Sequence, residues 1–549
     1  MRSLRDILCA RLRITRNQCW VLAYIAVAII GLVRVALTHR VFSHVADEPT
    51  HIACGYQWLT TGNYKGDTTH PPLERVLSAL PAVLLRKGSD VTAADPLAVI
   101  FHKIIEQDGN YERNLAYARL GNLLFMLTGT LATGFWVARY FGKGAGLLAT
   151  SMFVSLPPIL GHAGVATTDL AIASMIPAAI LTLERWIDLP SPGRAVLLGL
   201  AVGVGALSKF SFLLFFPIGC AIVIGTRFLC KTGAFSAKSL SLAIIVAALV
   251  VWSGYRFQVT TVALAHERGE GTMVNLAPKP LKSVASSFAR QVPIPAPLFV
   301  IGAGRVQLHN RNGHLAFLFS EVRQYGWWYY FPVVVFYKTP LPFLALAIVG
   351  IVLLCFRHRQ AMAFALIPVA FLLAVLPSSI NIGIRHVLPI YPALCACAAW
   401  AVLTLWRVNR LRLFAMALLV WFFAGSLLAH PDYLAWFNEA AGHHPEKIVV
   451  DSNLDWGQDM LRLGRILREK HIPAVYCLCF ESGALWRNGI ELNSIRDVPP
   501  ETPGWFALGL TRLAFDAEAR RGAYSWLNAY QYTMVGKSIR LYHVPGSSP

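Results

Sequence analysis

The sequence SLSLAIIVAALVVWSGYRF at 239–257 contains a single charged residue, Arg256, close to its end. An α-helix rises about 1.5 Å per residue, so a helix of this length crosses the roughly 30 Å hydrocarbon core of a bilayer. A similar run, SFLLFFPIGCAIVIGTRF, precedes it at 211–228, and the link between the two carries Lys231 and Lys238. The two runs therefore predict a pair of membrane-spanning helices joined by a basic turn.

Apolar runs of this kind recur along the chain. Of its 549 residues, 56% are hydrophobic and 14% are charged, whereas soluble proteins carry about 25% charged residues. We predict eleven spans, at 20–37, 117–137, 145–160, 170–187, 195–208, 211–228, 239–257, 340–356, 362–378, 386–405 and 412–429. The expected fold class is a mostly α, polytopic transmembrane helical bundle with long periplasmic loops and a small C-terminal α/β soluble domain.

The distribution of positive charge predicts the orientation. The net charge is +20, which in a soluble protein would suggest a nucleic-acid partner. Here the positive residues fall in every second short loop, which is the positive-inside pattern of membrane proteins. The basic loops contain Arg139 and Lys143; Arg185 and Arg194; Arg227, Lys231 and Lys238; Arg357 and Arg359; and Arg407, Arg410 and Arg412. We therefore expect a cytoplasmic N-terminus and no nucleic-acid partner.

The predicted spans divide the chain into three parts. Residues 1–19 form a basic cytoplasmic tail, 20–429 the membrane domain, and 430–549 a periplasmic C-terminal domain. The membrane domain includes two long outer loops, 38–116 and 258–338. This division places most polar sequence on the outer side.

Local patterns predict some structure within these parts. Amphipathic stretches at 49–61 and 72–86 are expected to lie along the membrane surface. For the C-terminal domain we predict a helix at 456–470 and strands at 474–480, 505–509 and 532–543. Cys477 and Cys479 alternate on one face of the first strand, which is poor geometry for pairing with each other, so no disulfide framework is expected.

Asp451, Asn453 and Asp455 resemble the beginning of a calcium-binding loop. The glycine comes one place late, and the last ligand position holds Arg462 rather than Glu, so we reject that interpretation. Helix capping by Asp455 or Asn453 is the preferred interpretation. A contact between domains is the alternative.

Charged residues also gather at the outer ends of several predicted spans. Asp47 and Glu48 open the first outer loop, and Asp169 stands at the mouth of a span. Lys209 lies in an outer turn, and Arg385 and His386 open a late span, all on the side where cations are disfavoured. Because ionisable groups near lipid are costly, these residues are candidates for function.

Such a set suits transfer of a group from a lipid phosphate. A carboxylate can take the proton of an acceptor hydroxyl, and cations can hold the departing phosphate. A site at membrane depth also excludes water.

Several segments resemble one family. They are DEPTHIACGYQWLTTGNYKGDTTHPPLERVLSALP at 47–81, ATTDL at 166–170, GWWYYFPVVVFYKTPLP at 326–342, GIRHVLPIYP at 383–392 and DSNLDWGQDMLRL at 451–463. In order and topological side they resemble the C-class, lipid-carrier-dependent glycosyltransferases of the protein mannosyltransferase and aminoarabinose transferase type, in their family-39-like bacterial branch. The resemblance covers about 20 to 545. It implies a bacterial inner-membrane enzyme that moves a sugar from polyprenyl phosphate to a protein, lipid or glycan acceptor on the periplasmic side.

The resemblance also implies roles for individual residues. The catalytic acids would be Asp47, Glu48 and Asp169. Lipid-phosphate binding would fall to Arg385, Lys209 and His386, and substrate binding to His70, His51 and Glu321. Some relatives place a divalent metal beside a Glu-Lys-Pro-Pro run; here His70 replaces the Glu-Lys pair, and His70 or His314 would be the candidate ligands.

Three other functions stay open at this point. A secondary transporter would place ionisable residues or broken helices at the midplane and show repeated halves, which we do not detect. A non-catalytic assembly subunit would keep the fold without chemistry. A ligase would move a whole glycan from a lipid diphosphate.

Overall fold

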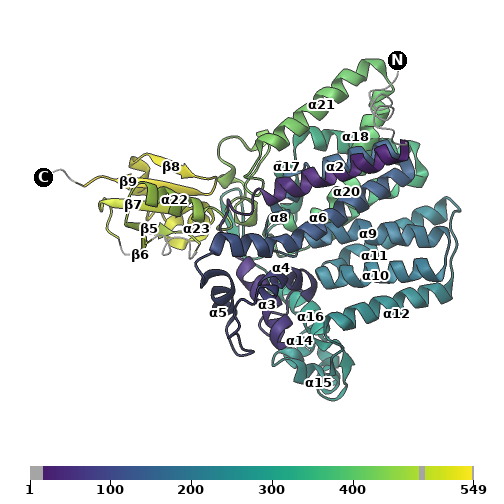
Figure 1. Ribbon diagram of the computed structural model, residues 1–549, viewed down its shortest axis with the longest axis horizontal. Helices are drawn as coiled ribbons and strands as arrows, with labels where there is room; N and C mark the ends of the chain where they lie inside the picture. Colours follow the sequence, from purple (N-terminus) through teal and green to yellow (C-terminus); the bar gives the residue numbers. More distant parts are fainter. Residues whose placement is uncertain (1–15, 481–488, 497, 547–549) are drawn as a thin grey trace.

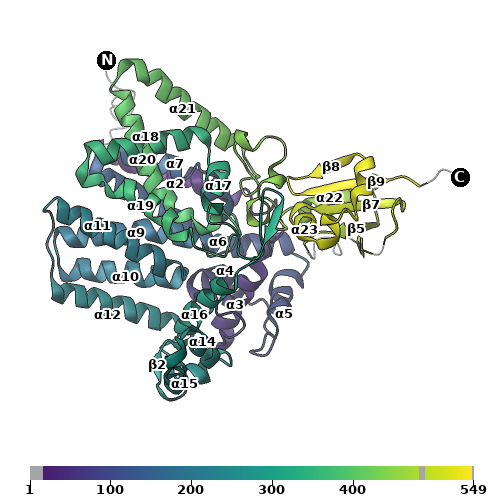
Figure 2. The ribbon, with the colours of Figure 1, turned by 180° about the vertical axis from the view of Figure 1, so that it is seen from behind.

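The computed structural model describes residues 16–480, 489–496 and 498–546. Long helices lie side by side at one end of the molecule, and a small sheet lies at the other (Figures 1 and 2). Among the described residues, seven helices are long and apolar enough to cross a membrane. They are α2 (Arg16–Ala36), α6 (Tyr111–Phe141), α9 (Asp169–Asp188), α11 (Phe212–Leu229), α12 (Ala237–Gly254), α20 (Tyr391–Trp406) and α21 (Asn409–Leu428). The predicted tail up to residue 15 lies outside the described residues.

Two bent helix pairs and two shorter apolar segments complete this region. The pairs are α7 (Lys143–Phe153) with α8 (Pro157–Ala163), bent by 64°, and α17 (Tyr330–Lys338) with α18 (Leu341–Arg357), bent by 119°. The shorter segments are α10 (Pro192–Ser208) and Arg359–Val375, which contains α19 (Ala363–Val375). Each predicted span thus coincides with a helix or a bent pair. The described residues give seven to nine helices of spanning length, so the count of eleven stays a prediction.

α9 and α12 illustrate an interior and a peripheral span. The apolar window of α9 is 83% buried, whereas that of α12 is 11% buried. On α12, Ile244, Ile245 and Leu249 are exposed. An exposed aliphatic stripe along a whole helix is stable against hydrocarbon rather than water, so α12 lies at the lipid-facing edge of the bundle.

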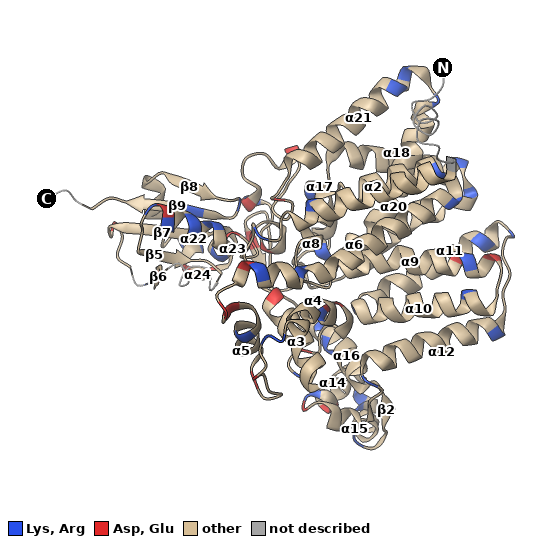
Figure 3. Cartoon of the chain, in the orientation of Figure 1, with Lys and Arg blue, Asp and Glu red and all other residues tan. Residues whose placement is uncertain are grey.

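Lys and Arg residues gather at the helix ends that lie farthest from the C-terminal sheet (Figure 3). This arrangement agrees with the charge pattern used to predict the orientation. The helix ends nearer the sheet meet the two long outer loops.

The first outer loop folds inward and forms α3 (Glu48–Thr61), α4 (Pro72–Leu84) and α5 (Leu97–Phe101). α3 approaches α4 so closely that a Cβ on Gly55 would lie 1.9 Å from the carbonyl oxygen of Arg75. Both faces of α3 are buried, including His51 and Gln57 on its polar side. The prediction that 49–61 lies on the membrane surface is therefore wrong, because protein rather than lipid covers this helix.

Before α17, the second outer loop contains four α-helices and two short strand pairs. The helices are α13 (Val262–Ala265), α14 (Gly269–Leu276), α15 (Lys282–Gln291) and α16 (Pro297–Asn312). The strand pairs are β1 (Val259–Thr260) with β2 (Ile294–Pro295), and β3 (Ala316–Leu318) with β4 (Glu321–Arg323), both antiparallel.

The C-terminal region is built on a five-stranded sheet of order β6-β5-β7-β9-β8. The strands are β5 (Ala474–Leu478), β6 (Glu491–Ser494), β7 (Gly504–Gly509), β8 (Tyr532–Val535) and β9 (Ile539–Val544), and the helices are α22 (Met460–Glu469), α23 (Leu510–Phe515) and α24 (Ala517–Arg520). β5 runs parallel to β6 and β7, whereas β9 pairs antiparallel with β7 and β8. The predicted run 532–543 is two strands, because Gly536 turns the chain with a φ of 58°. β6 was not predicted.

Cys477 and Cys479 form a disulfide, so the expectation that they would not pair is wrong. β5 ends at Leu478, and Cys479 is therefore not held in the regular strand. The two Cα atoms lie 5.5 Å apart, within the range that a disulfide spans.

The segment 451–459 contacts the first outer loop and the turn that carries Arg385. The Asn453 side-chain oxygen accepts a hydrogen bond from Ile384 N (3.0 Å), and backbone N–H groups of Ser43 and Ala46 donate to Gln458 and Trp456 (both 3.0 Å). The following helix, α22, begins only at Met460. Capping by Asn453 or Asp455 is thus wrong, and the alternative of a contact between regions is confirmed for Asn453.

Candidate active site

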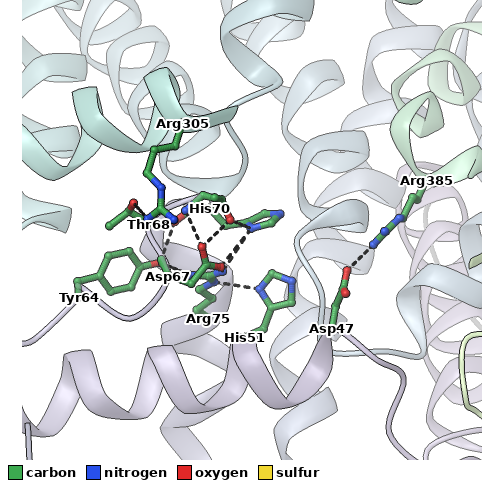
Figure 4. A network of polar contacts seen from close by, with 10 residues as sticks. Asp47, His51, Tyr64, Asp67, Thr68, His70, Arg75, Arg305 and Arg385 are labelled. Carbon is green, nitrogen blue, oxygen red and sulfur yellow. Dashed lines mark hydrogen bonds and ion pairs between the residues drawn. The ribbon is translucent and has the colours of Figure 1, made fainter. Parts of the chain in front are cut away.

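Asp47 and Arg385 meet although they lie 338 positions apart in the chain. Asp47 stands just before α3, and within the described residues its side chain makes no capping hydrogen bond. Its Oδ2 lies 2.5 Å from Arg385 Nη1 (Figure 4). The Asp47 side chain is 36% exposed, so this carboxylate is open to a ligand.

Arg385 lies in a short 3-10 helix, Ile384–His386, behind Gly383. A Cβ on Gly383 would come 2.3 Å from Ser452 Oγ, so glycine allows the turn to approach the segment that carries Trp456. The guanidinium of Arg385 stacks 4.3 Å from the centre of the Trp456 ring. Burial alone would lower the pKa of Arg385, but the carboxylates of Asp47 and Asp169 raise it above its usual range, so the group stays charged.

Asp169, the first residue of α9, adds two further ion-pair contacts to this site. Its Oδ2 lies 3.8 Å from Arg385 Nη1, and its Oδ1 lies 2.5 Å from Lys209 Nζ. Thr167 Oγ1 donates to the same carboxylate at 3.0 Å. The structure therefore brings together Asp47, Arg385, Asp169 and Lys209, which we call the outer charge cluster. All four were predicted site residues.

Glu48 follows Asp47 in sequence but faces another way. It is fully buried and accepts two hydrogen bonds from Arg119, both 2.8 Å, and one each from Val45 N (2.8 Å) and Ala166 N (2.7 Å). Burial alone would raise the pKa of Glu48, but Arg119 and these donors hold it below its usual range. Both carboxylate oxygens of Glu48 are thus occupied by protein donors, whereas the Asp47 side chain is partly exposed; the catalytic role of Glu48 stays a prediction.

A second network lies beside the cluster and contains two residues that the sequence did not single out, Asp67 and Arg75. Arg75 forms an ion pair with the Asp67 carboxylate, and its Nε donates to His51 Nδ1 at 2.9 Å. Its Nη2 lies 3.2 Å from His70 Nδ1, and Nη1 donates to Tyr64 at 3.2 Å. Figure 4 shows this loop network next to the Asp47–Arg385 pair.

The charges of the loop network determine its protonation states. Burial alone would raise the pKa of Asp67, but Arg75 and His70 hold it well below the usual range of a carboxyl. Burial and the Arg75 guanidinium keep the pKa of His51 well below its ordinary value. The network therefore contains an aspartate, a guanidinium and a neutral His51 at neutral pH.

The remaining predicted residues take different positions. His386 is partly exposed, and its ring centre lies 6.3 Å from that of Phe331. Its ring interacts electrostatically with Lys209, Arg385 and Asp169. Glu321 is an exposed residue at the beginning of β4 and pairs with Arg323 at 2.8 Å. His314 precedes β3, and its ring centre lies 5.4 Å from that of His309. Glu321 is thus held by contacts outside the outer charge cluster.

A cavity of about 640 Å³ opens beside the loop network. Thr69, next to His70, lines it together with Arg268, Asn275, Arg305 and His309 from α14 and α16. Its lining is basic and rich in hydrogen-bonding groups, which suits a polar ligand.

The residues around His70 do not fit a divalent metal ion. His51 Nδ1 accepts a hydrogen bond from Arg75, and His70 Nδ1 faces the same guanidinium. A metal ion there would have to displace or approach a buried positive charge. Among the described residues, there is also no group of three or more His, Cys, Asp and Glu side chains suited to a metal.

Fold and site together define a class of protein, a polytopic membrane protein with acids and cations paired at one set of helix ends. Residues 100–252 match the family described as dolichyl-phosphate-mannose-protein mannosyltransferase. The match confirms the resemblance to lipid-carrier-dependent glycosyltransferases that the motifs predicted. No protein of curated function matches the sequence.

Solved structures with a similar chain path include ArnT from Cupriavidus metallidurans bound to undecaprenyl phosphate. It shares 14% identity with a TM-score of 0.49, and the match covers 96% of this chain and 99% of that one. The Archaeoglobus fulgidus oligosaccharyltransferase tethered with an acceptor peptide shares 10% identity with a TM-score of 0.49, over 95% of this chain and 74% of that one.

Proposed function

We propose that this protein is a membrane glycosyltransferase. It takes a sugar from a polyprenyl-phosphate donor and transfers it to a protein, lipid or glycan acceptor on the periplasmic side of a bacterial inner membrane. The observation that carries the proposal is the open Asp47 carboxylate, 2.5 Å from the buried guanidinium of Arg385. The family matched by residues 100–252 is described by a donor of this kind, a mannose on dolichyl phosphate.

The chemistry assigns one role to each member of the outer charge cluster. The acceptor hydroxyl gives its proton to Asp47 while its oxygen bonds to the anomeric carbon of the sugar. The bond from that carbon to the phosphate oxygen breaks, and the lipid phosphate leaves with the electron pair. Arg385 and Lys209 stabilise its growing negative charge, and Asp169 holds both cations in place.

The side-chain exposures of Asp47 and Asp169 support these different roles. Side-chain exposure is 36% for Asp47 but only 3% for Asp169, so Asp47 is the acid that an acceptor can reach. The cluster lies at helix ends rather than at mid-span, which fits transfer at the membrane surface better than transport through the midplane. No step needs a metal ion, in keeping with the guanidinium beside His70.

The division into domains 20–429 and 430–549 remains part of the proposal.

The test compares Asp47→Asn with the unchanged protein in vesicles that contain a panel of polyprenyl-phosphate sugars. Release of free polyprenyl phosphate is measured. Loss of a general base lowers rates by about 100- to 10,000-fold, and we expect a loss in that range with normal protein level. Asp90→Asn, an exposed acid of the same loop with a 63% exposed side chain, serves as the matched control. Full transfer by Asp47→Asn would support a non-catalytic subunit, and no release by the unchanged protein from any donor would refute the proposal.

A further inference from the structure

α15 (Lys282–Gln291) has a surface divided into three sectors. At about 100° per residue, one sector carries Ala285, Ser286 and Ala289, and a second sector, about 120° away, carries Ser283, Ser287 and Arg290. The first sector packs inward: Ala289 is buried, and Ser286 donates to Glu270 of α14 at 2.7 Å.

The third sector is an apolar stripe with no protein cover among the described residues. Leu281, Val284, Phe288 and Val292 fall on it, with exposures of 51%, 61%, 39% and 39%. The stripe lies between the protein-facing and polar sectors. Lone exposed apolar residues are common, but a continuous stripe marks a contact surface.

This stripe continues the lipid-facing surface of α12. In Figures 1 and 2, α15 lies near the outer end of α12. The chain between them exposes Phe257 at 56%, Val259 at 53% and Leu264 at 74%. Exposed apolar residues therefore recur along the chain from α12, with Ile244 and Leu249, through this connecting segment to α15.

We propose that α15 is an interfacial helix that rests its apolar stripe in the outer leaflet of the membrane. A helix of this kind buries its apolar face at the boundary between headgroups and acyl chains. Lys279 and Lys282 flank the stripe and are exposed, so the chemistry of the partner is an anionic phospholipid surface.

The contacts of α15 connect this anchor to the candidate site. Glu270 of α14 pairs with Arg290 at 2.8 Å, and α14 packs on α16, where a Cβ on Gly304 would lie 2.8 Å from Thr272 Cγ2. Arg305 of α16 donates to Thr68 Oγ1 at 2.8 Å, two residues before His70. Through these contacts, α15 fixes the distance between the lipid surface and the side of the cavity that α14 and α16 line.

The test uses the full chain in vesicles of phosphatidylcholine with phosphatidylglycerol, doped with a phospholipid that carries a photoreactive diazirine in its acyl chain. After illumination, mass spectrometry locates the lipid adducts. We expect adducts on Leu281, Val284 and Phe288 but not on Ser283 or Ser287. Residues of α12, such as Ile244 and Leu249, are the internal reference for lipid exposure.

Substitutions in the apolar stripe should then lower the amount of lipid adduct. Val284→Ser with Phe288→Ser should lower adducts on 281–292 by about tenfold relative to α12, because roughly two large apolar side chains leave the interface. Ser287→Ala is the matched control and should leave labelling unchanged. Lys282→Gln should lower labelling in phosphatidylglycerol vesicles but not in pure phosphatidylcholine.

Labelling of α12 without labelling of 281–292 would overturn the proposal, as would equal labelling of Ser287 and Val284. A stripe occupied by a partner protein would give the first of these results. The measurement needs no sugar transfer, so its failure is distinct from failure of the proposed function.

Discussion

Two charge networks lie beside α3, and they differ in what their arginines have left to donate. Arg75 donates from Nε to His51, from Nη1 to Tyr64 and the Asp67 carbonyl, and from Nη2 to the Asp67 carboxylate. Arg385 forms its ion pairs through Nη1, and in the described part of the chain its buried Nε has no hydrogen-bond partner. An unsatisfied buried donor costs about 1–3 kcal/mol. Arg385 therefore has a donor that the described residues leave unused.

The two networks differ in whether they have groups left for a ligand. The loop network is complete within the protein, so it holds 64–75 in place. The outer charge cluster keeps an open carboxylate and a spare guanidinium donor, so it can receive a phosphate and a hydroxyl. Both networks pair an arginine with an aspartate, but they differ in their remaining hydrogen-bonding capacity.

The largest expected effect is on stability, from Arg75→Gln. Removing one partner of a buried ion pair leaves the other uncompensated and costs about 3–5 kcal/mol. We expect a much lower thermal midpoint in detergent and low protein level. The double variant Asp67→Asn with Arg75→Gln should recover part of the loss. Normal stability with abolished transfer would instead assign Arg75 to the site.

Arg385→Gln should show the opposite pattern. Loss of one charge-stabilising donor lowers transfer by about 100- to 1,000-fold, and the folded protein should remain. Release of polyprenyl phosphate and the thermal midpoint are measured on the same preparation. Arg323→Gln, an exposed arginine of the second outer loop, is the control. If Arg385→Gln unfolds the protein and Arg75→Gln does not, the roles of the two networks are reversed.

The sequence predicted every member of the outer charge cluster, and His51 and His70 of the loop network, but not Asp67 or Arg75. Asp169, Lys209 and Arg385 stand at the ends of apolar runs, where the cost of charge near lipid makes each one conspicuous. Asp67 and Arg75 lie within a polar loop, where a charge is ordinary. Their burial depends on the close approach of α3 and α4 at Gly55, which no local pattern reveals.

Prediction and structure differ in two further places, because the position of a residue in the sequence does not give the direction in which its side chain points. Asp47 and Glu48 are neighbours, but successive helical residues point about 100° apart, so one faces Arg385 and the other Arg119. The amphipathic pattern at 49–61 is similarly ambiguous, since a buried polar network and a lipid surface both favour a two-sided helix. The structure resolves this: α3 lies inside, and the exposed apolar stripe belongs to α15.

Asp455 is a further buried acid, and in the described part of the chain no ion pair with a cation is present at its carboxylate. Burial raises the pKa of Asp455 to about 7, although Thr511 N and Gly457 N donate to it. An unfolded aspartate titrates near pH 4, so between about pH 4 and pH 7 the folded state binds more protons, and stability falls as pH rises through that window.

Asp455→Asn should flatten this dependence. We expect the unchanged protein to lose about 1–3 kcal/mol between pH 5 and pH 8 from this group, and the variant to lose less. Thermal midpoints of the full chain at the two pH values measure the difference, with Asp90→Asn as the exposed control. An identical pH slope in the variant would show that Asp455 does not cause it.

The smallest effect should come from Glu321→Gln. The motif resemblance implied a substrate-binding role, but Glu321 is 61% exposed and pairs with Arg323, itself 54% exposed. Exposed ion pairs contribute about 0–1 kcal/mol, so both stability and transfer should stay within about twofold, as measured by the thermal midpoint and polyprenyl phosphate release. A loss comparable to that of Arg385→Gln would mean that the β3–β4 hairpin contacts the substrate. The outer charge cluster would then be only part of the site, and the contrast between open and completed networks would not suffice to locate it.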